Sequence, residues 1–379
     1  MIADNELEGL LATIRRLEPD FLADLQHLVN IDCGSYTKTG VDEVGRFVAD
    51  RMRRLGAEVR TVPNAEYGET VVGVFRGTGT RKALLIGHMD TVFDEGTVAE
   101  RPYTVRDGRA HGPGTDDMKG GLLGALYALE ALREATGGSA RSKWLPFDTL
   151  TFVANPDEEI GSPTSTPVIR EAAAEADVAF VLEAARENGN IVSARKGIGD
   201  FVVTISGRAA HAGVEPEKGR SAIVEAAHKT LALTALNGRW PGVSVNVGVI
   251  RGGTRPNVVA ESCVIEIDLR GVTRAEMEEA EAAIREICAR STVPDVTATV
   301  ERKHFWLPFE KSAQTYGLAN MAIEIGGRLG LSFADQSTGG ASDANTTSGM
   351  GVATLDGLGP VGGNAHSADE YLELDSIVP

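Results

Sequence analysis

Short, almost wholly apolar runs recur along the first half of this chain and alternate with stretches of helical periodicity. The runs are Val71–Phe75, Ala83–Gly87, Leu150–Ala154 and Val178–Leu182. Runs of this kind suit strands that are buried on both faces, as in a mainly parallel sheet covered by helices. Helical spacing of leucines and other apolar residues marks 5–30, 41–55 and 118–134. The alternation predicts an α/β domain built on a mainly parallel sheet.

From Gly199 the pattern changes to strands with one apolar face. Strands are expected at 200–206, 243–250, 262–270 and 296–301, with helices at 217–236 and 273–290. The second helix opens on a capping box of Thr273 and Glu276. The order β-α-β-β-α-β is the ferredoxin-like arrangement. We therefore predict a sheet domain of residues 1–197 and 306–379, interrupted by an inserted α+β domain of residues 198–305.

The charge of the chain excludes several classes of partner. Its 379 residues carry a formal net charge of −17. Such an acidic surface argues against nucleic acid, which binds through Lys and Arg, and against an anionic membrane surface. The three cysteines are far apart and form no disulfide framework. The first residues lack a basic and apolar leader, so we expect a cytoplasmic protein.

Potential metal ligands follow three of the apolar runs. His88 follows the second run, Asp157-Glu158-Glu159 follows the third, and Glu183 follows the fourth. Ligands of open α/β sheets bind beyond the carboxyl ends of the strands, so these side chains are expected in one crevice. Two more candidates are Asp117, in a glycine-rich loop, and His366, in a late loop.

Each candidate also has a purely structural interpretation. His88 alone is more often a buried histidine satisfied by its neighbours, and Asp117 serves equally well as a helix N-cap. Asp90 shifts the balance, because a nearby carboxylate fixes the tautomer of a metal-bound imidazole. Together the two imidazoles and the carboxylates are the donor set that suits Zn²⁺. Two ions about 3.5–4 Å apart would need one bridging carboxylate.

The order of these motifs resembles a known family. H-x-D at 88–90, G-x-G-x-x-D-M-K-G at 112–120, D-E-E at 157–159, a strand-terminal acid and a late histidine occur in the same order in the di-zinc metallopeptidases. That family contains carboxypeptidase G (glucarpidase), acetylornithine deacetylase, succinyl-diaminopimelate desuccinylase and the aminoacylases. The resemblance covers essentially the whole chain, and the segments 211–222 and 339–343 favour the glutamate carboxypeptidase branch.

The resemblance implies a role for each candidate ligand. Asp117 would bridge two zinc ions. His88 and Glu183 would complete one ion, and Glu159 and His366 the other. The same resemblance makes Glu158 the general base and acid, and Asp90 the residue that orients His88. Co²⁺ or Mn²⁺ are possible substitutes for zinc at such a site.

The resemblance also assigns work to the inserted domain. It would serve as a lid and join two chains into a homodimer. His211 would reach the active site of the neighbouring subunit and help to stabilise the oxyanion. The family also has a cis peptide after the bridging acid, so Asp117–Met118 is expected to be cis.

The implied activity is hydrolysis of an amide bond by a zinc-bound hydroxide, releasing a C-terminal amino acid for which glutamate is the first candidate. The resemblance implies that the substrate would be a small molecule or short peptide with a free carboxylate. Arg270 is the first candidate to bind that carboxylate, because an arginine donates two hydrogen bonds to it. Asn257 resembles a family position near the substrate, and the amides of Gly339 and Gly340 are further candidates. A surface ion pair is an equally good interpretation of Arg270.

Three other functions compete with a carboxypeptidase. The first is a deacylase of the same family, such as an acetylornithine deacetylase-like amidase, which differs in the side of the amide that it recognises. The second is a Rossmann dehydrogenase, but the glycine-rich segment ends in Asp-Asp-Met-Lys and forms no G-x-G-x-x-G after the first strand. The third is a binding or scaffold protein, against which the intact Glu158 argues.

Overall fold

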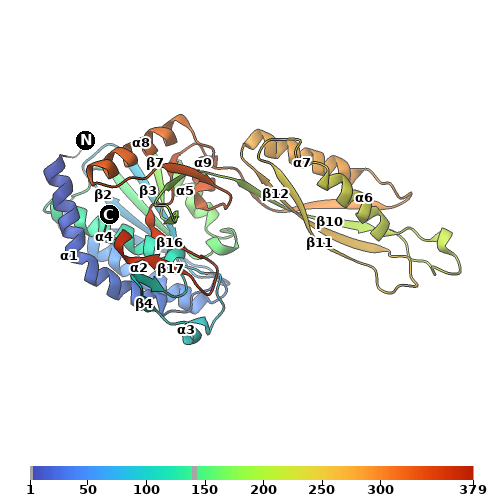
Figure 1. Ribbon diagram of the computed structural model, residues 1–379, viewed down its shortest axis with the longest axis horizontal. Helices are drawn as coiled ribbons and strands as arrows, with labels where there is room; N and C mark the ends of the chain where they lie inside the picture. The colour runs from blue at the N-terminus through green and yellow to red at the C-terminus, as the bar shows by residue number, and fades with distance from the viewer. Residues whose placement is uncertain (1–2, 139–142, 379) are drawn as a thin grey trace. The chain divides into compact units, whose positions relative to one another are not determined.

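The computed structural model describes residues 3–138 and 143–378, which form two compact units (Figure 1). Unit 1 is Met1–Ala194, Lys311–Thr338 and Ser342–Pro379, and unit 2 is Arg195–Glu310 with Gly339–Ala341. The inserted domain expected from sequence, 198–305, falls inside unit 2. The segment Gly339–Ala341, which we expected in the first domain, groups with unit 2.

Unit 1 is built on a six-stranded sheet of order β1-β2-β6-β3-β7-β15. The strands are β1 (Glu58–Val62), β2 (Thr70–Arg76), β3 (Lys82–His88), β6 (Thr149–Asn155), β7 (Val178–Val181) and β15 (Ala353–Leu355). Strands β6, β3, β7 and β15 are parallel, whereas β2 runs antiparallel to both β6 and β1. The prediction of a mainly parallel α/β sheet is therefore confirmed.

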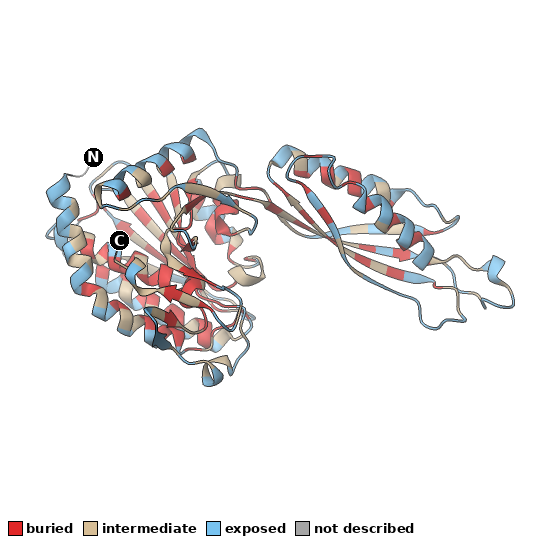
Figure 2. Cartoon of the chain, viewed as in Figure 1, coloured by how far each residue is buried: buried red, intermediate tan, exposed pale blue. Residues whose placement is uncertain are grey.

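Helices cover both faces of this sheet. They are α1 (Asp4–Val29), α2 (Lys38–Leu55), α4 (Gly120–Ala135), α5 (Thr166–Ala174), α8 (Ala313–Arg328) and α9 (Asp343–Gly349). A further single turn, α3 (Thr97–Glu100), lies in the segment between β3 and β4 and has no buried residue. Successive strand residues point to opposite faces, and both sets are buried, for example Ala83 with Leu150 and Leu84 with Val153. Figure 2 shows the buried residues along the central strands. Burial on both faces explains why these strands are apolar at nearly every position.

Smaller elements of unit 1 carry the loops that matter for function. A five-stranded sheet has the order β4 (Thr104–Arg106), β5 (Arg109–His111), β17 (Tyr371–Glu373), β16 (Gly359–Gly363) and β8 (Ala184–Ala185). Strands β9 (Ile191–Arg195) and β14 (Asp335–Thr338) pair separately. Single turns are the π-turn η1 (Thr115–Lys119) and the 3-10 turns η2 (Glu158–Ile160) and η4 (Leu374–Ser376).

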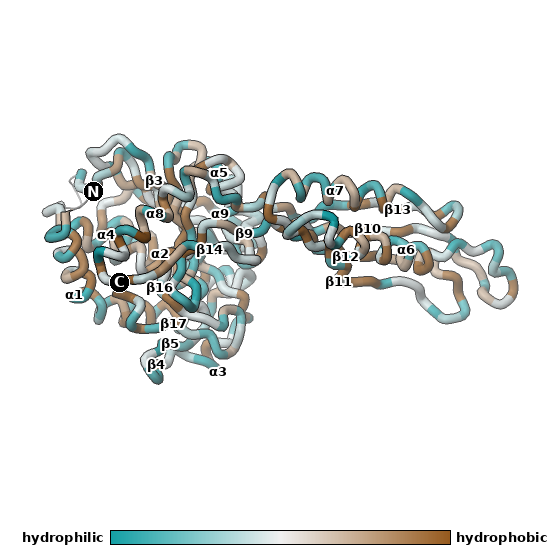
Figure 3. Tube along the Cα trace, turned by 45° about the horizontal axis from the view of Figure 1, so that its top comes forward, coloured by the Kyte–Doolittle hydropathy of each residue, from teal (hydrophilic) through white to brown (hydrophobic). Residues whose placement is uncertain are grey.

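Unit 2 has the predicted ferredoxin-like arrangement. Its elements are β10 (Gly197–Ser206), the 3-10 turn η3 (Pro216–Lys218), α6 (Ala222–Thr234), β11 (Ser244–Gly252), β12 (Ser262–Gly271), α7 (Arg274–Ala289) and β13 (Thr297–Trp306). The antiparallel sheet has the order β11-β12-β10-β13. Helices α6 and α7 pack on it with their apolar sides, and hydropathy alternates along both helices (Figure 3).

Two local predictions in unit 2 can be compared with the structure. Thr273 accepts a hydrogen bond from the Glu276 amide at 3.2 Å and so caps α7. The helix expected at 217–236 is shorter, because η3 occupies its beginning and Gly219 is extended. In the described part of the chain, no helix is both long and apolar enough to cross a membrane.

Helix α4 approaches strand β7 closely through a glycine. A Cβ on Gly121 would overlap the carbonyl oxygen of Leu182, the residue before Glu183. Three residues further along the same helix, a Cβ on Gly124 would meet no atom within 4 Å. The contact at Gly121 therefore sets how near α4 lies to the end of β7.

We expect Gly121→Ala to lower the free energy of unfolding by about 2 kcal/mol or more, because overpacking forces the backbone apart. Gly124→Ala is the matched control, and its better helix propensity should raise stability by up to about 1 kcal/mol. Urea unfolding of both variants measures the difference. Equal stability of the two variants would contradict the close contact.

Candidate metal centre

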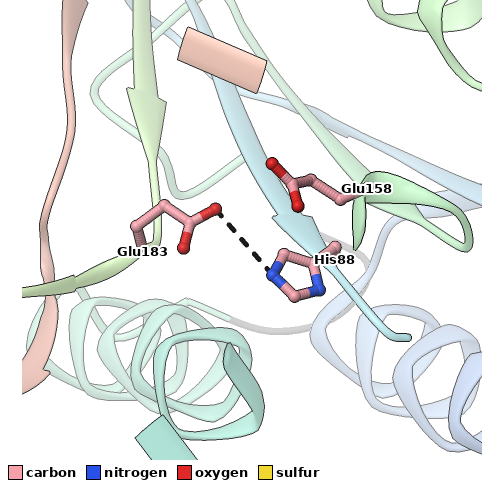
Figure 4. A group of neighbouring side chains, drawn as sticks. All are labelled: His88, Glu158 and Glu183. Carbon is pink, nitrogen blue, oxygen red and sulfur yellow. Dashed lines mark ion pairs between the residues drawn. The ribbon is translucent and has the colours of Figure 1, made fainter. Parts of the chain in front are cut away.

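The ends of three parallel strands lie in register at one edge of the unit 1 sheet. His88 of β3 pairs with Asn155 of β6, and Ile86 of β3 pairs with Val181 of β7. The residues that follow β6 and β7 therefore emerge beside His88. Figure 4 shows the side chains of His88, Glu158 and Glu183 close together at this edge.

Asp117 lies between two imidazoles and places one carboxylate oxygen against each. Its Oδ1 is 2.9 Å from Nε2 of His88, and its Oδ2 is 3.1 Å from Nε2 of His366. Glu183 Oε1 is 3.8 Å from the same nitrogen of His88, and Glu159 Oε2 is 3.0 Å from that of His366. The structure thus brings together all five side chains that sequence analysis named as ligands.

The donor atoms fit a metal. His88 is 1% exposed and the Glu159 side chain 5%, whereas the His366 side chain is 54% exposed and leaves the cluster accessible. Glu159 Oε1 is buried and has no hydrogen-bond partner among the described residues. A buried acceptor without a partner is costly, and a cation would relieve that cost. Imidazole nitrogens with carboxylate oxygens are the set that Zn²⁺ takes.

The electrostatics of the cluster show an excess of negative charge. Burial, with the Glu183 carboxylate nearby, raises the pKa of Glu158 well above its usual range, and burial also raises the pKa of Glu159. Hydrogen bonds to Asp117 and Glu159 raise the pKa of His366 to about 10. Burial opposes the charged form of His88, but Asp117 and Asp90 outweigh it and raise its pKa. Each shift is one that a bound cation would reverse.

Asp90 ties the end of β3 to the turn that carries the two glutamates. Its Oδ1 and Oδ2 accept the amides of Glu158 and Glu159, each at 3.2 Å. Its Oδ2 also accepts the hydroxyl of Ser35 at 2.7 Å. Nδ1 of His88 lies 3.0 Å from the Asp90 carbonyl oxygen and 3.4 Å from Oδ1. One buried carboxylate therefore fixes both the imidazole and the glutamate turn.

Asp117 itself sits in η1, directly before a cis peptide bond to Met118. The turn is entered through Gly114, whose φ of 75° suits a residue without a Cβ. Helix α4 follows at once, so the turn that carries Asp117 leads directly into a largely buried helix.

Asp157, the first acid of the Asp-Glu-Glu triplet, is satisfied without a cation. Its carboxylate accepts the amide of Thr164 at 2.7 Å, the hydroxyl of Thr164 at 2.6 Å and the hydroxyl of Ser165. These bonds anchor the loop that leads to α5. Only the second and third acids of the triplet are therefore available to the cluster.

Asp343 is a further buried acid beside the site. It begins α9 and accepts the hydroxyl of Ser162 at 2.7 Å and the side-chain amide of Asn155. Burial raises its pKa to about 6, against the effect of these two bonds. Because Asn155 is the last residue of β6, Asp343 helps to hold the end of this strand.

The residues predicted to bind substrate lie in unit 2, and each is described there by itself. Arg270 donates from Nε to both oxygens of Asp268 at 2.9 Å, and its Nη2 is 2.7 Å from the same carboxylate. Its guanidinium is therefore committed to an ion pair. The Gly340 carbonyl accepts Nη1 of Arg195 at 3.1 Å, and Gly339 is exposed.

His211 and Asn257 belong to two loops that are joined by main-chain bonds. The carbonyl of Asn257 accepts the amide of Ala212 at 3.0 Å. Nδ1 of His211 accepts the amide of Gly213 at 3.2 Å, and no hydrogen bond to its Nε2 occurs among the described residues. Both side chains are exposed.

Sequence analysis missed three residues that support the cluster: Ser35, Asp343 and Glu370. The Glu370 carboxylate accepts the backbone amides of Asp116 and Asp117. Ser35 and Glu370 are single polar residues in loops, and no motif in the surrounding sequence indicates a role for them. Asp343 stands in the glycine-rich loop that we used for the family resemblance, but the pattern gave it no role. Their importance follows from contacts across long sequence separations.

Comparison with known proteins identifies the family of the chain. Residues 84–379 match the pattern of peptidase family M20/M25/M40. The chain is 29% identical over 368 residues to carboxypeptidase G2 of Pseudomonas sp. (strain RS-16), covering 95% of this chain and 86% of that protein. It is 27% identical over 292 residues to acetylornithine deacetylase of Proteus mirabilis (strain HI4320), covering 72% of each.

A solved structure shares the fold. Aminopeptidase PepT from Bacillus cereus superposes with a TM-score of 0.77 at 24% identity, covering 95% of each chain. A mainly parallel sheet with clustered imidazoles and carboxylates at its strand ends defines a metallohydrolase of the peptidase and amidohydrolase class. This chain belongs to peptidase family M20/M25/M40.

We expect the contribution of Asp343 to stability in metal-free protein to fall as pH rises. The pKa of Asp343 is about 6 in the folded protein, above the ordinary 3.8, so folding favours the protonated carboxyl group. The resulting contribution to stability is fully present below about pH 4 and is lost as the pH rises through 6. Linkage converts that difference into about 3 kcal/mol. Between pH 4.5 and pH 7.5, urea unfolding should show Asp343→Asn gaining on the wild type by about 2 kcal/mol. Asp94→Asn, an exposed control, should show no such gain.

Proposed function

We propose that this protein is a carboxypeptidase-type amide hydrolase that uses two divalent metal ions, Zn²⁺ in the first place. The observation that carries the proposal is the Asp117 carboxylate, with one oxygen on each of two imidazoles. His88, Glu183 and one oxygen of Asp117 would hold one ion. Glu159, His366 and the other oxygen would hold the second.

Bound ions of this kind polarise a substrate carbonyl and lower the pKa of a water to about 7. Three ligand carboxylates against two divalent ions leave the centre about one positive charge. This residual charge favours binding of a developing oxyanion. Co²⁺ or Mn²⁺ also suit these ligands.

Glu158 is the residue that we propose moves the proton. It stands beside Glu159 on η2, it is held by its amide to Asp90, and its carboxylate lies near His88 and Glu183. Burial favours its protonated form, so it can accept a proton from water and return it to the leaving nitrogen. Asp90 keeps both His88 and Glu158 in place during this exchange.

The side of the amide that is recognised separates two activities. A carboxypeptidase binds the free carboxylate of the released amino acid, and Arg270, Asn257, Gly339 and Gly340 remain our candidates for this role. Arg270 would have to exchange its bond to Asp268 for the substrate. The alternative is a deacylase, which the similarity to acetylornithine deacetylase favours.

The first experiment measures metal content together with turnover. We expect near two zinc ions per chain, and amino-acid release from an N-acyl-glutamate but not from N-acetyl-ornithine. Turnover of N-acetyl-ornithine alone would keep the metal centre and favour the deacylase. A protein that binds no metal, even with added Zn²⁺, would remove the basis of the proposal.

Replacing the proposed base tests its role directly. Glu158→Gln should lower kcat by about 10²–10⁴-fold, since proton transfer is worth roughly that factor. Its metal content should stay unchanged, because Glu158 is not among the proposed ligands. Glu187→Gln removes an exposed carboxylate from the neighbouring loop and serves as the control. Unchanged turnover in metal-loaded Glu158→Gln would exclude Glu158 as the base.

Unit 2 is proposed to join two chains. Strand β11 is the outer strand of its sheet, and an edge strand offers unpaired backbone groups to a partner. Apolar side chains are exposed beside it: Val224 (47%) and Leu231 (72%) on one face of α6, and Ile250 (52%) on β11. In such a homodimer, His211 is proposed to act in the site of the partner chain.

The dimer proposal predicts a clear change in mass. Leu231→Glu should weaken self-association, because it places a charge in the apolar contact. Met321→Glu is the matched control, since Met321 is an exposed apolar residue of α8 in unit 1. Analytical ultracentrifugation over a range of concentrations measures both. A wild-type monomer at micromolar concentration would contradict the proposal.

A further inference from the structure

The side chain of Glu370 binds the main chain of the turn that carries Asp117. Its Oε1 accepts the amides of Asp116 and Asp117 at 2.9 and 3.1 Å, and its Oε2 accepts the amide of Gly114 at 3.0 Å. Glu370 is 2% exposed. We call this carboxylate and its three amides the Glu370 anchor. It holds the turn at its entrance and at the bridging residue.

The Glu370 anchor contains no basic side chain. Within residues 3–138 and 143–378, Glu370 makes no ion pair, and its carboxylate is bound only through backbone amides. Burial raises the pKa of Glu370 to about 7, and the three converging amides partly offset this by favouring the ionised form. Because the contacts are to the main chain, they fix the path of η1 whatever side chains the turn bears.

Glu370 also stands at the base of the hairpin that carries His366. It directly precedes β17, which pairs with β16 through Tyr371 and Gly363 and with β5 through Tyr371 and His111. The Glu370 carbonyl lies 3.2 Å from Nδ1 of His111. The residue is therefore fixed by a sheet on its main-chain side and by η1 on its side-chain side.

We propose that Glu370 is a positioning residue that sets Asp117 against His366 before any metal binds. The two ligands come from separate segments, and the anchor is a direct link between those segments. The 3.1 Å contact between Asp117 Oδ2 and His366 Nε2 is then a consequence of the anchored main chain. This inference rests on the proposed metal-dependent function and adds a residue to it.

Glu370→Gln disturbs the anchor with little change in shape. One acceptor oxygen becomes an NH₂ group, so at least one backbone amide faces a donor. Loss of a group that holds a metal ligand in place costs about 10–100-fold in metal affinity. Glu373→Gln is the matched control, since Glu373 lies in β17 and pairs with Arg109, away from η1.

The test is zinc affinity of the full chain, measured by competition with a chelating indicator. We expect Glu370→Gln to bind zinc about 10–100-fold more weakly than the wild type, and Glu373→Gln to match the wild type. Excess Zn²⁺ should restore turnover to Glu370→Gln, whereas Glu158→Gln should stay inactive when loaded. Wild-type affinity in Glu370→Gln overturns the inference and leaves the proposed function intact.

Hydrogen exchange of the metal-free wild type tests the same inference without a mutation. The amides of Gly114, Asp116 and Asp117 should exchange slowly, as protected main chain does. Fast exchange without metal and slow exchange with zinc would mean that the ion orders the turn, and would overturn the inference even if Glu370→Gln failed to fold. A wild type that binds no zinc would instead overturn the proposed function.

Discussion

Repulsion among the clustered carboxylates at the strand ends of unit 1 is the constraint that the surrounding structure has to meet. Asp117, Glu158, Glu159 and Glu183 crowd around two imidazoles at one edge of the sheet. Such a group is unfavourable alone and favourable around cations. Hydrogen bonds from the surrounding structure accordingly hold these residues together. Asp90 secures the glutamate turn, and parallel pairing aligns the strands that present the ligands.

Much of the candidate site follows from sequence because its proposed ligands stand where buried strands end. An apolar run that stops at a histidine or an acid predicts a buried strand and places that polar side chain at its carboxyl end. His88, Glu159 and Glu183 are of this kind. Asp117 and His366 lie in glycine-bearing loops, so they are recognisable only by their order relative to the others. The fold of the inserted domain is also predictable from sequence, because alternating strands and two amphipathic helices indicate the order of its elements.

The remaining features depend on contacts that no local pattern records. Ser35 reaches Asp90 across 55 residues, and Glu370 reaches Asp117 across 253. The strands of the small sheet are two to five residues long, too short for a periodic signal. Arg270 has a side chain suited to a carboxylate, but its first partner is Asp268 of the same strand. Side-chain chemistry alone does not say which partner is chosen.

The position of His366 has a consequence for the order in which the protein matures. A ribosome delivers His88, Asp117, Glu159 and Glu183 first, then the whole of unit 2, and only later the second imidazole, 249 residues after Asp117. A metal ion that meets the unfinished chain therefore finds one histidine and an excess of acids. The complete set of proposed ligands therefore exists only after unit 2 has been synthesised.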